Sequence, residues 1–462
     1  MTKSEMIKGS VPLLLGIIII VVVVLVIPNA VRYIGKASGT PANLRINYEG
    51  VVGKMPTPWR NLAQGGEEPK EMMAGVVAQT KALRPEYIRL DHIYDAFKVV
   101  SRKDGQLSYD WTGLDGAVRT ILATGAKPFL SLSYMPEAIG TGDIISVARD
   151  WAEWGAVTQA TIEHYSGRGA MNIEGVIYEV WNEPDLFGSF KTYGDKNYLE
   201  MYSASARAAN RATNVNRFEI GGPATTGLYQ NWLERLIKYV DANNLRMDFM
   251  SWHRYSYDLE QFEKDAKQAR AWAEKIPALV NLKFYVTEWG HNSEVDKGYD
   301  SKFGAIHTIA GSRVMMGGVD RAFVFEVKDG PGEEKYWGRW GLLTHEKFGP
   351  PEKKPRYYAI DFLNSLGNIR LSVAGEGSWI KAIASTDNNG NIKLMIVNYD
   401  SKGTHTESVP VLFENLPKMN FKFTRRDFLG ATRTQQVATS EANWKSTELF
   451  SPNSAAMFTM EF

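Results

Sequence analysis

The chain has 462 residues, of which 44% are apolar, so it is long enough for more than one domain and for a large core. Its 53 Lys and Arg residues nearly balance its 52 Asp and Glu residues, so no nucleic-acid partner is expected. Cysteine is absent, which excludes disulfides and thiolate metal sites, and the histidines form no His-x-x-x-His pair. A cofactor or a dedicated metal centre is therefore not expected.

Residues 11–27 form an uncharged run dominated by Ile, Val and Leu, near the lower limit of about 17 residues for a membrane-spanning helix. We predict an uncleaved transmembrane anchor here, between a short tail at 1–10 and a linker at 28–42. A cleaved signal peptide is the alternative, because Lys3 and Lys8 give the chain a basic start. However, Pro28-Asn29-Ala30 is a poor small-x-small cleavage site.

From residue 43 the chain alternates short apolar runs with amphipathic segments, which is typical of repeated β-α units. A helical face is clearest in Trp232, Leu233, Leu236, Ile237 and Val240. The number and order of the predicted strands favour an α/β fold, a closed (β/α)8 TIM barrel over residues 43–366. These strands lie near Trp59–Gln64 and at Tyr87–Leu90, Pro128–Ser133, Val176–Trp181, Phe218–Gly221, Phe249–His253, Phe284–Glu288 and Arg321–Val327.

Two of these strands end in a glutamate. Glu183 lies in Trp181-Asn182-Glu183-Pro184, and Glu288 lies in Thr287-Glu288-Trp289-Gly290. A glycosidic bond needs an acid that protonates the departing oxygen and a carboxylate that faces the anomeric carbon. Because all strands of a barrel end at one face, the two glutamates are suited to this chemistry. A buried structural role is the alternative for each of them.

Beyond residue 366 the pattern changes to alternating strands, and we predict a β-sandwich accessory domain over residues 367–462. Asn388-Asn389-Gly390-Asn391 is typical of a hairpin turn, because Asn and Gly tolerate positive φ. Packing against the barrel is the preferred role of this domain, and carbohydrate binding is the alternative. Strands are predicted at Ile380–Ser385, Ile392–Tyr399, Val409–Phe413, Phe421–Thr424 and Ala456–Phe462.

Several short pieces, in this order, resemble glycoside hydrolase family 39, the β-xylosidase and α-L-iduronidase family of the clan A barrels. They are Tyr87-Ile88-Arg89-Leu90, Pro128-Phe129 before Met135-Pro136, Trp181-Asn182-Glu183-Pro184, Ser251-Trp252-His253-Arg254-Tyr255 and Thr287-Glu288-Trp289. The resemblance covers about Trp59 to Leu366. It implies a retaining glycosidase that acts on an oligo- or polysaccharide by a two-glutamate double displacement and requires no cofactor.

The resemblance also implies roles for individual residues. Glu183 resembles the acid/base, which must begin protonated, and Glu288 resembles the nucleophile. Asn182 resembles the amide that hydrogen-bonds the sugar 2-hydroxyl, and Tyr255 resembles the phenol that donates to the nucleophile. Arg89 resembles the arginine beneath the nucleophile. His253 is expected to line the same pocket, although a structural role is the alternative for each of these side chains.

Two further positions bear on the substrate. Asp91 stands where this family usually has a His, with His92 displaced by one, and a carboxylate there would accept hydroxyl donors and repel a uronic acid. Trp337, in the loop after the eighth strand with Tyr336 and Trp340, either stacks on a sugar or packs under the loop. A β-xylosidase-like enzyme and an exopolysaccharide hydrolase both fit these residues.

Two other functions stay open at this stage. They are a membrane-tethered carbohydrate-binding protein without turnover, and a transglycosylase that shares the first half of the mechanism. Because polysaccharides are found outside cells, we expect an extracytoplasmic catalytic domain anchored by residues 11–27. The sequence does not give the sugar, the linkage, exo or endo action, or the oligomeric state.

Overall fold

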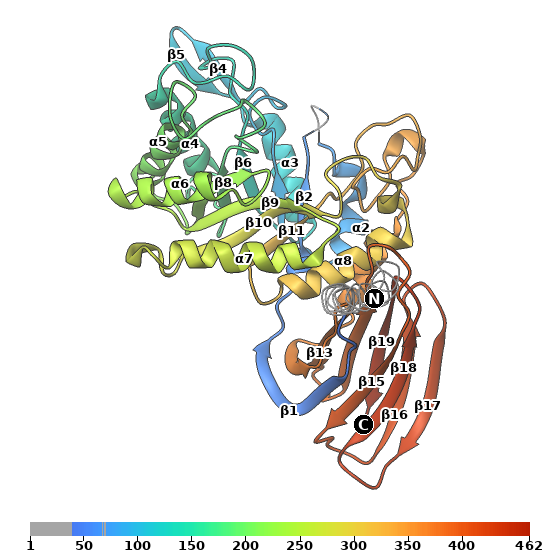
Figure 1. Ribbon diagram of the computed structural model, residues 1–462. Helices are drawn as coiled ribbons and strands as arrows, with labels where there is room; N and C mark the ends of the chain where they lie inside the picture. Colours follow the sequence, from blue (N-terminus) through green and yellow to red (C-terminus); the bar gives the residue numbers. More distant parts are fainter. Residues whose placement is uncertain (1–38, 67, 69–70) are drawn as a thin grey trace, which may run out of the picture.

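The structure, a computed structural model, describes residues 39–66, 68 and 71–462 (Figure 1). The predicted tail and anchor, and the linker up to residue 38, lie outside these residues. Within the described ranges, none of the helices combines the length and the apolar character needed to cross a membrane. The anchor and the membrane location therefore stay predictions.

Eight parallel strands close into a barrel and follow one another around it in chain order. Each predicted barrel strand is present, with ends shifted by at most a few residues. The fold class predicted from the strand count is therefore confirmed. The strands are β2 (Asn61–Gln64), β3 (Tyr87–Leu90), β6 (Lys127–Leu132), β7 (Ile177–Val180), β8 (Glu219–Thr225), β9 (Phe249–Tyr255), β10 (Lys283–Gly290) and β11 (Arg321–Phe325).

Helices cover the outside of the barrel (Figure 1). Side chains fix where several of them begin: Asp150, Asn197 and Asp258 each accept a backbone N–H in the first turn. The predicted apolar face of α6 is fully buried. The helices are α2 (Val77–Ala82), α3 (Thr112–Ala123), α4 (Trp151–Tyr165), α5 (Tyr198–Arg211), α6 (Gln230–Ala242), α7 (Leu259–Ala273), α8 (Lys302–Met315) and α9 (Pro355–Leu363). Short 3-10 helices cover Pro58–Arg60, Ala74–Val76, Pro277–Leu279, Lys297–Asp300 and Glu346–Phe348.

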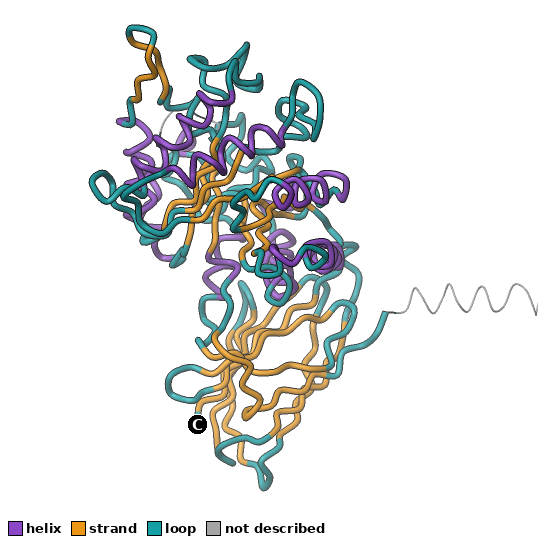
Figure 2. Tube along the Cα trace, turned by 90° about the vertical axis from the view of Figure 1, so that its left-hand side faces the viewer, coloured by secondary structure: helices purple, strands orange, loops and turns teal. Residues whose placement is uncertain are grey.

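The second domain is a nine-stranded sheet (Figure 2). Side chains from its two ends, such as Phe413 and Phe423, share one buried core, so the sheet folds over on itself as a sandwich. Its strands are β1 (Leu44–Lys54), β12 (Ile369–Ala374), β13 (Ile380–Thr386), β14 (Ile392–Asn398), β15 (Glu407–Glu414), β16 (Asn420–Asp427), β17 (Thr432–Ala438), β18 (Trp444–Phe450) and β19 (Ser454–Glu461). A separate hairpin joins β4 (Val100–Lys103) to β5 (Gln106–Tyr109).

Strand β1 corrects the predicted boundary between the domains. It was assigned to the barrel, yet it pairs antiparallel with β12 and parallel with β15 in the sandwich. Leu44 and Ile46 are buried in the sandwich core. Their burial there explains why this strand belongs to the sandwich and not to the barrel. The barrel begins only at β2, and the sandwich therefore uses both ends of the described chain.

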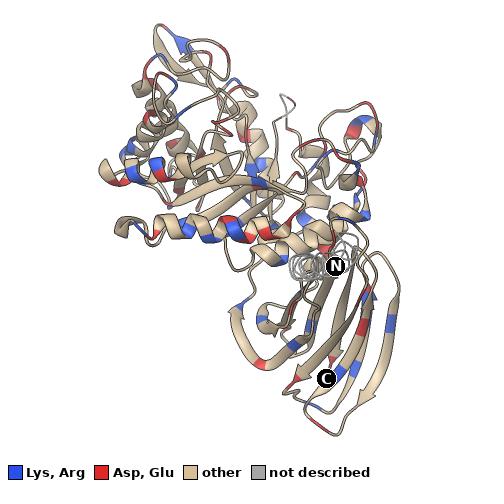
Figure 3. Cartoon of the chain, in the orientation of Figure 1, with Lys and Arg blue, Asp and Glu red and all other residues tan. Residues whose placement is uncertain are grey.

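The two domains are joined by polar contacts. Arg313 on α8 donates two hydrogen bonds, of 2.9 and 2.8 Å, to the carboxylate of Glu376 between β12 and β13. The hydroxyl of Tyr399, the residue after β14, donates to the backbone carbonyl of Tyr257 at 2.7 Å. Packing of the sandwich on the barrel, the preferred alternative, is therefore observed. Acidic and basic side chains are interspersed over both domains (Figure 3).

An aromatic layer fills the barrel below the ends of its strands. Phe129 and Phe323 pack at 4.8 Å between ring centroids, and Phe249 stacks on Tyr285 at 4.6 Å. The interior of such a barrel is normally packed with side chains. This layer leaves the space at the C-terminal ends of the strands as the place for polar groups.

The Arg313–Glu376 pair predicts a measurable contribution to stability. Arg313→Met should lower the free energy of unfolding by about 2 kcal/mol, because a charged, partly buried double hydrogen bond is lost. Urea unfolding measures this change. In the control, Lys264→Met, an exposed ion pair with Glu260 is removed, which should cost less than about 1 kcal/mol. Equal effects of the two variants would contradict the assignment.

Candidate active site

The predicted site residues come together at the C-terminal ends of the barrel strands, where barrel enzymes hold their active sites. The turn after β7 is fastened on both sides. The Ser131 hydroxyl donates to the Trp181 carbonyl at 2.8 Å, and the Glu183 N–H donates to the Ala224 carbonyl at 3.0 Å. Glu183 has a φ of 47°. These contacts hold Glu183 beside the neighbouring strands.

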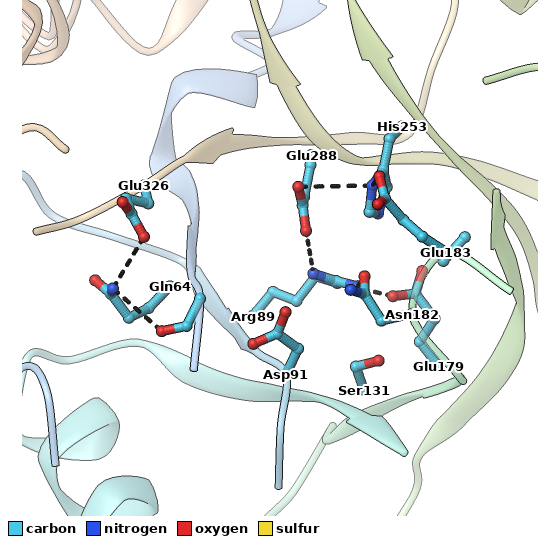
Figure 4. A network of polar contacts seen from close by, with 12 residues as sticks. Gln64, Arg89, Asp91, Ser131, Glu179, Asn182, Glu183, His253, Glu288 and Glu326 are labelled. Atoms are coloured by element: carbon cyan, nitrogen blue, oxygen red, sulfur yellow. Dashed lines mark hydrogen bonds and ion pairs between the residues drawn. The ribbon is translucent and has the colours of Figure 1, made fainter. Parts of the chain in front are cut away.

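A buried arginine organises the site (Figure 4). The guanidinium of Arg89 on β3 donates to Glu179 at 2.7 Å, to Glu288 at 2.9 Å and to the Asn182 side-chain oxygen at 2.7 Å. The Arg89 side chain is completely buried. One cation therefore joins strands β3 and β10 to β7 and the turn that follows it.

Glu288 is bound through both carboxylate oxygens. Arg89 donates to one oxygen, and the Tyr255 hydroxyl donates to the other at 2.9 Å. Burial raises the pKa of Glu288, while the positive charges of His253 and Arg89 act in the opposite direction. The net direction of the Glu288 pKa is upward, and the hydrogen bonds from Arg89 and Tyr255 favour the ionised form of the carboxyl group.

Glu183 has a different environment. Nδ1 of His253 lies 2.8 Å from a Glu183 oxygen and 3.6 Å from a Glu288 oxygen. Burial lowers the pKa of His253, but the two carboxylates outweigh burial, so the net direction is upward. One oxygen of each glutamate and the imidazole nitrogen all lie within 4.8 Å of one another. The three groups can therefore share protons.

Asn182 connects Arg89 to a tyrosine that the sequence interpretation missed. The Asn182 amide donates to the Tyr134 hydroxyl at 2.8 Å, and both side chains line the cavity. Burial raises the pKa of Tyr134, so this phenol stays protonated at neutral pH. The sequence did contain a signal for Tyr134. It is an aromatic residue just after the third barrel strand, and the other site residues also lie at or just after the ends of barrel strands.

The site opens into a cavity of about 680 Å³, a usual size for a small-molecule site. Glu183 and Glu288 face it, as do Tyr255 and Asp91. One Asp91 oxygen accepts the Gly66 N–H at 2.7 Å. His92 lines the cavity as well and is bound to Asp95 at 2.8 Å. At Asp91 the sequence differs from the usual family pattern, and this difference adds a carboxylate and a neighbouring imidazole to the wall of the cavity.

Two predicted positions need correction. His253 does not line the cavity, because its ring is completely buried behind the two glutamates. Trp337 does not line it either, because its ring packs against Gly332, where an added Cβ would lie 2.4 Å from a ring atom. Of the two readings of Trp337, packing under the loop is the one observed. Trp340 lines the cavity instead.

Three further carboxyl groups lie beneath the site. Glu179 is the buried partner of Arg89. Asp329 pairs with Lys354 at 3.0 Å, and Glu326 accepts a hydrogen bond from Gln64 at 3.1 Å. Burial and the nearby Asp329 charge raise the pKa of Glu326 well above its ordinary value. The side chains of Glu326 and Asp329 are both buried.

Among the described residues, two groups have the ligand types and spacing of a metal site. One is Glu183, His253 and Glu288, and the other is Glu68, His345 and Glu346. In the first group, Glu288 is already bound by Arg89 and Tyr255. The expectation that no metal is needed stays a prediction.

A closed parallel barrel that presents two glutamates, a buried arginine and a tyrosine at one end has the features of a glycoside hydrolase. Residues 45–415 match the family model "Glycosyl hydrolases family 39". The chain therefore belongs to this family, as its motifs suggested. It is a glycosidase, and its substrate is a carbohydrate.

Relatives of known activity agree with this family. The chain is 27% identical over 422 residues to a β-xylosidase from Caldicellulosiruptor saccharolyticus. The aligned residues cover 83% of this chain and 84% of the relative. It is 25% identical over 312 residues to a β-xylosidase from Geobacillus stearothermophilus, over 59% of this chain and 60% of the relative.

Solved structures show the same fold. A monomeric β-xylosidase from Caulobacter crescentus CB15 superimposes with a TM-score of 0.75 at 21% identity, over 91% of this chain and 99% of that one. A glycoside hydrolase family 39 enzyme from Xanthomonas axonopodis pv. citri also has a TM-score of 0.75, at 20% identity, over 91% and 97% of the two chains.

The buried arginine generates a prediction. Arg89→Met should lower the free energy of unfolding by about 3 to 5 kcal/mol, because Glu179 and Glu288 would lose their buried cation. Urea unfolding measures this loss. Adding Glu179→Gln should restore part of it, since one buried charge is then absent. The control is Arg119→Met, at an exposed ion pair. If Arg89→Met is no more harmful than this control, the network does not hold the site together.

Proposed function

We propose that the protein is a retaining glycoside hydrolase with Glu288 as nucleophile and Glu183 as acid/base. The proposal rests on the unequal environment of the two carboxyl groups. Arg89 and Tyr255 both donate to Glu288, which suits an ionised nucleophile. Among the described residues, Glu183 receives no such pair of donors, and it contacts His253, a group that can carry a proton.

The spacing of the carboxyl groups supports a retaining reaction. Oxygens of Glu183 and Glu288 lie within 4.8 Å of each other. Retaining enzymes hold their carboxyl groups about 5 to 5.5 Å apart, whereas inverting enzymes need about 6.5 to 9.5 Å to admit a water molecule between them. A direct attack by one carboxylate on the anomeric carbon therefore fits this site.

The proposed reaction has two steps. In the first, a Glu288 oxygen bonds to the anomeric carbon while the glycosidic bond breaks, and the proton of Glu183 passes to the departing oxygen. In the second, ionised Glu183 takes a proton from water, and the water oxygen displaces Glu288 from the anomeric carbon. Both carboxyl groups then return to their starting protonation. Asn182, held by Arg89 and Tyr134, is placed to bind the sugar hydroxyl next to the anomeric centre.

For the substrate we propose a neutral glycoside, in the first place a β-xyloside. The two β-xylosidase relatives support this choice. Asp91 is almost fully buried and faces the cavity, so it would accept a hydroxyl donor and repel a uronic acid carboxylate. An exopolysaccharide built from neutral sugars remains compatible with the same wall.

Covalent labelling tests the proposed nucleophile. Incubation with activated 2-fluoro glycosides, beginning with the xyloside, should add the mass of one glycosyl group to the intact protein. Glu288→Gln should abolish the label, because the attacking oxygen is lost. Glu183→Gln should still be labelled, since an activated leaving group needs no acid, but should hydrolyse natural glycosides at a strongly reduced rate.

Glu326→Gln is the matched control for labelling, because it replaces another buried carboxyl group at the neighbouring strand. This variant should be labelled like the wild type. A label that persists in Glu288→Gln would refute the assignment. The absence of both labelling and hydrolysis across a broad panel of glycosides would favour the carbohydrate-binding alternative.

The pH dependence of kcat/KM gives a further prediction. The pKa of Glu288 is raised, so the carboxylate takes up its proton at a higher pH than a free glutamate, and activity should fall as the pH drops through this raised value. Tyr255→Phe removes a donor to the ionised form. It should shift the acid limb upward by roughly one pH unit.

The control for this prediction is Tyr193→Phe, at a tyrosine that is 62% exposed. Its acid limb should coincide with that of the wild type. An acid limb unchanged by Tyr255→Phe would mean that the hydrogen bond to Glu288 does not affect its ionisation.

A further inference from the structure

The turn that follows Glu183 exposes apolar side chains to the cavity. Leu186 is 57% exposed and Phe187 is 40% exposed, and Tyr229, whose hydroxyl contacts Thr226, is 43% exposed. All three line the catalytic cavity. Large apolar side chains that gather at a pocket, rather than singly on the surface, mark a binding surface.

The backbone of this turn is fixed to the proposed acid/base. The N–H groups of Leu186 and Phe187 donate to the Glu183 carbonyl at 3.0 and 2.7 Å. The indole of the buried Trp181 donates to the Phe187 carbonyl at 3.0 Å. Leu186 and Phe187 are therefore held beside Glu183 by the backbone of the turn, and the surface needs little reorganisation to receive a ligand.

The polar groups next to Leu186, Phe187 and Tyr229 form hydrogen bonds with one another. Thr226 donates through its backbone N–H and its hydroxyl to the two oxygens of Asp185, at 3.0 and 2.5 Å. The Thr226 hydroxyl also lies 2.9 Å from the Tyr229 hydroxyl. Because these groups satisfy one another, they do not require hydroxyl groups from a ligand, and the ring of Tyr229 is held towards the cavity as apolar surface.

Another part of the cavity wall has a different character. The segments that follow β3, β10 and β11 contribute the charged or polar side chains of Asp91, His92, Glu294 and Arg339, together with the rings of Phe325 and Trp340. Burial lowers the pKa of Arg339 to about 10, so it is still a cation at neutral pH. Such groups suit the hydroxyl groups of a sugar ring. The exposed aliphatic and aromatic side chains that follow β7 and β8 thus lie on the side of the acid/base, whereas these four polar side chains come from other strands.

This difference assigns the two ends of the substrate. An acid/base must contact the departing oxygen, so whatever is attached to that oxygen lies beside Glu183. We propose that the leaving group bound by Leu186, Phe187 and Tyr229 is an apolar alkyl or aryl aglycone rather than a further sugar. The inference rests on the proposed roles of Glu183 and Glu288, and it names the class of glycoside that the site cleaves.

A series of n-alkyl β-xylosides from propyl to octyl tests the proposal. Alkanols of this series have nearly the same acidity, so a longer chain changes only the apolar contact. We expect kcat/KM to rise with chain length, by up to about fourfold for each methylene that becomes fully buried. Leu186→Asn, a change of similar size at an exposed position, should reduce this rise, because one of the apolar contacts is lost.

Val280→Asn is the matched control. Val280 is 60% exposed and precedes β10 at the far end of the barrel, and this variant should keep the wild-type dependence on chain length. Turnover that does not vary with chain length would overturn the inference. So would xylobiose or xylotriose cleaved with a higher kcat/KM than octyl xyloside, because the wall would then be a platform for sugars.

The outcome also separates this inference from the proposed function. The same series is prepared on the sugar that labels Glu288, if that sugar is not xylose. Hydrolysis of the propyl glycoside without a chain-length effect would refute only the apolar subsite. Failure of every glycoside, with no labelling of Glu288, would refute the proposed function itself.

Discussion

The active site depends on one buried cation. The guanidinium of Arg89 lies above the aromatic layer of the barrel, with its centre 6.0 Å from the centroid of Phe129, and it is paired with Glu179, Asn182 and Glu288. A buried charge of either sign is costly unless it is paired and hydrogen-bonded. Each member of the network therefore requires the others, and the positions of the nucleophile and of the amide are set by the same side chain.

The two glutamates share a cavity but not an environment. Glu288 receives a cation and a phenol, whereas Glu183 contacts an imidazole whose pKa is raised by the carboxylates around it. Such a difference is how one site gives two carboxyl groups opposite roles. The cavity wall is also uneven, since Leu186, Phe187 and Tyr229 follow β7 and β8, whereas Asp91, His92, Glu294 and Arg339 follow other strands. Family membership establishes a glycosidase, and the differences between the walls suggest what this glycosidase cleaves.

Local patterns predicted most of the fold, because each barrel strand is a short apolar run between amphipathic segments. Strand β1 escaped prediction, since its partners β12 and β15 are distant in sequence and no local signal distinguishes a barrel strand from a sandwich strand. Glu183 and Glu288 were predicted because strand ends meet at one face, whereas Asn182, Tyr255 and Arg89 were implied by the resemblance to family 39. Trp337 and His253 were placed wrongly with respect to the cavity, because loop conformation and burial depth depend on tertiary packing. Tyr134 was missed because its partner Asn182 lies on another strand's turn.

The central claim is that Glu288 attacks the anomeric carbon directly, and the stereochemistry of the first product tests it most directly. Proton NMR should follow the hydrolysis of a glycoside of known anomeric configuration from the first minutes, before mutarotation equilibrates the sugar. Two successive displacements predict that the sugar first appears with the configuration of the substrate. A first product of inverted configuration would show that water attacks in a single step and would contradict the account.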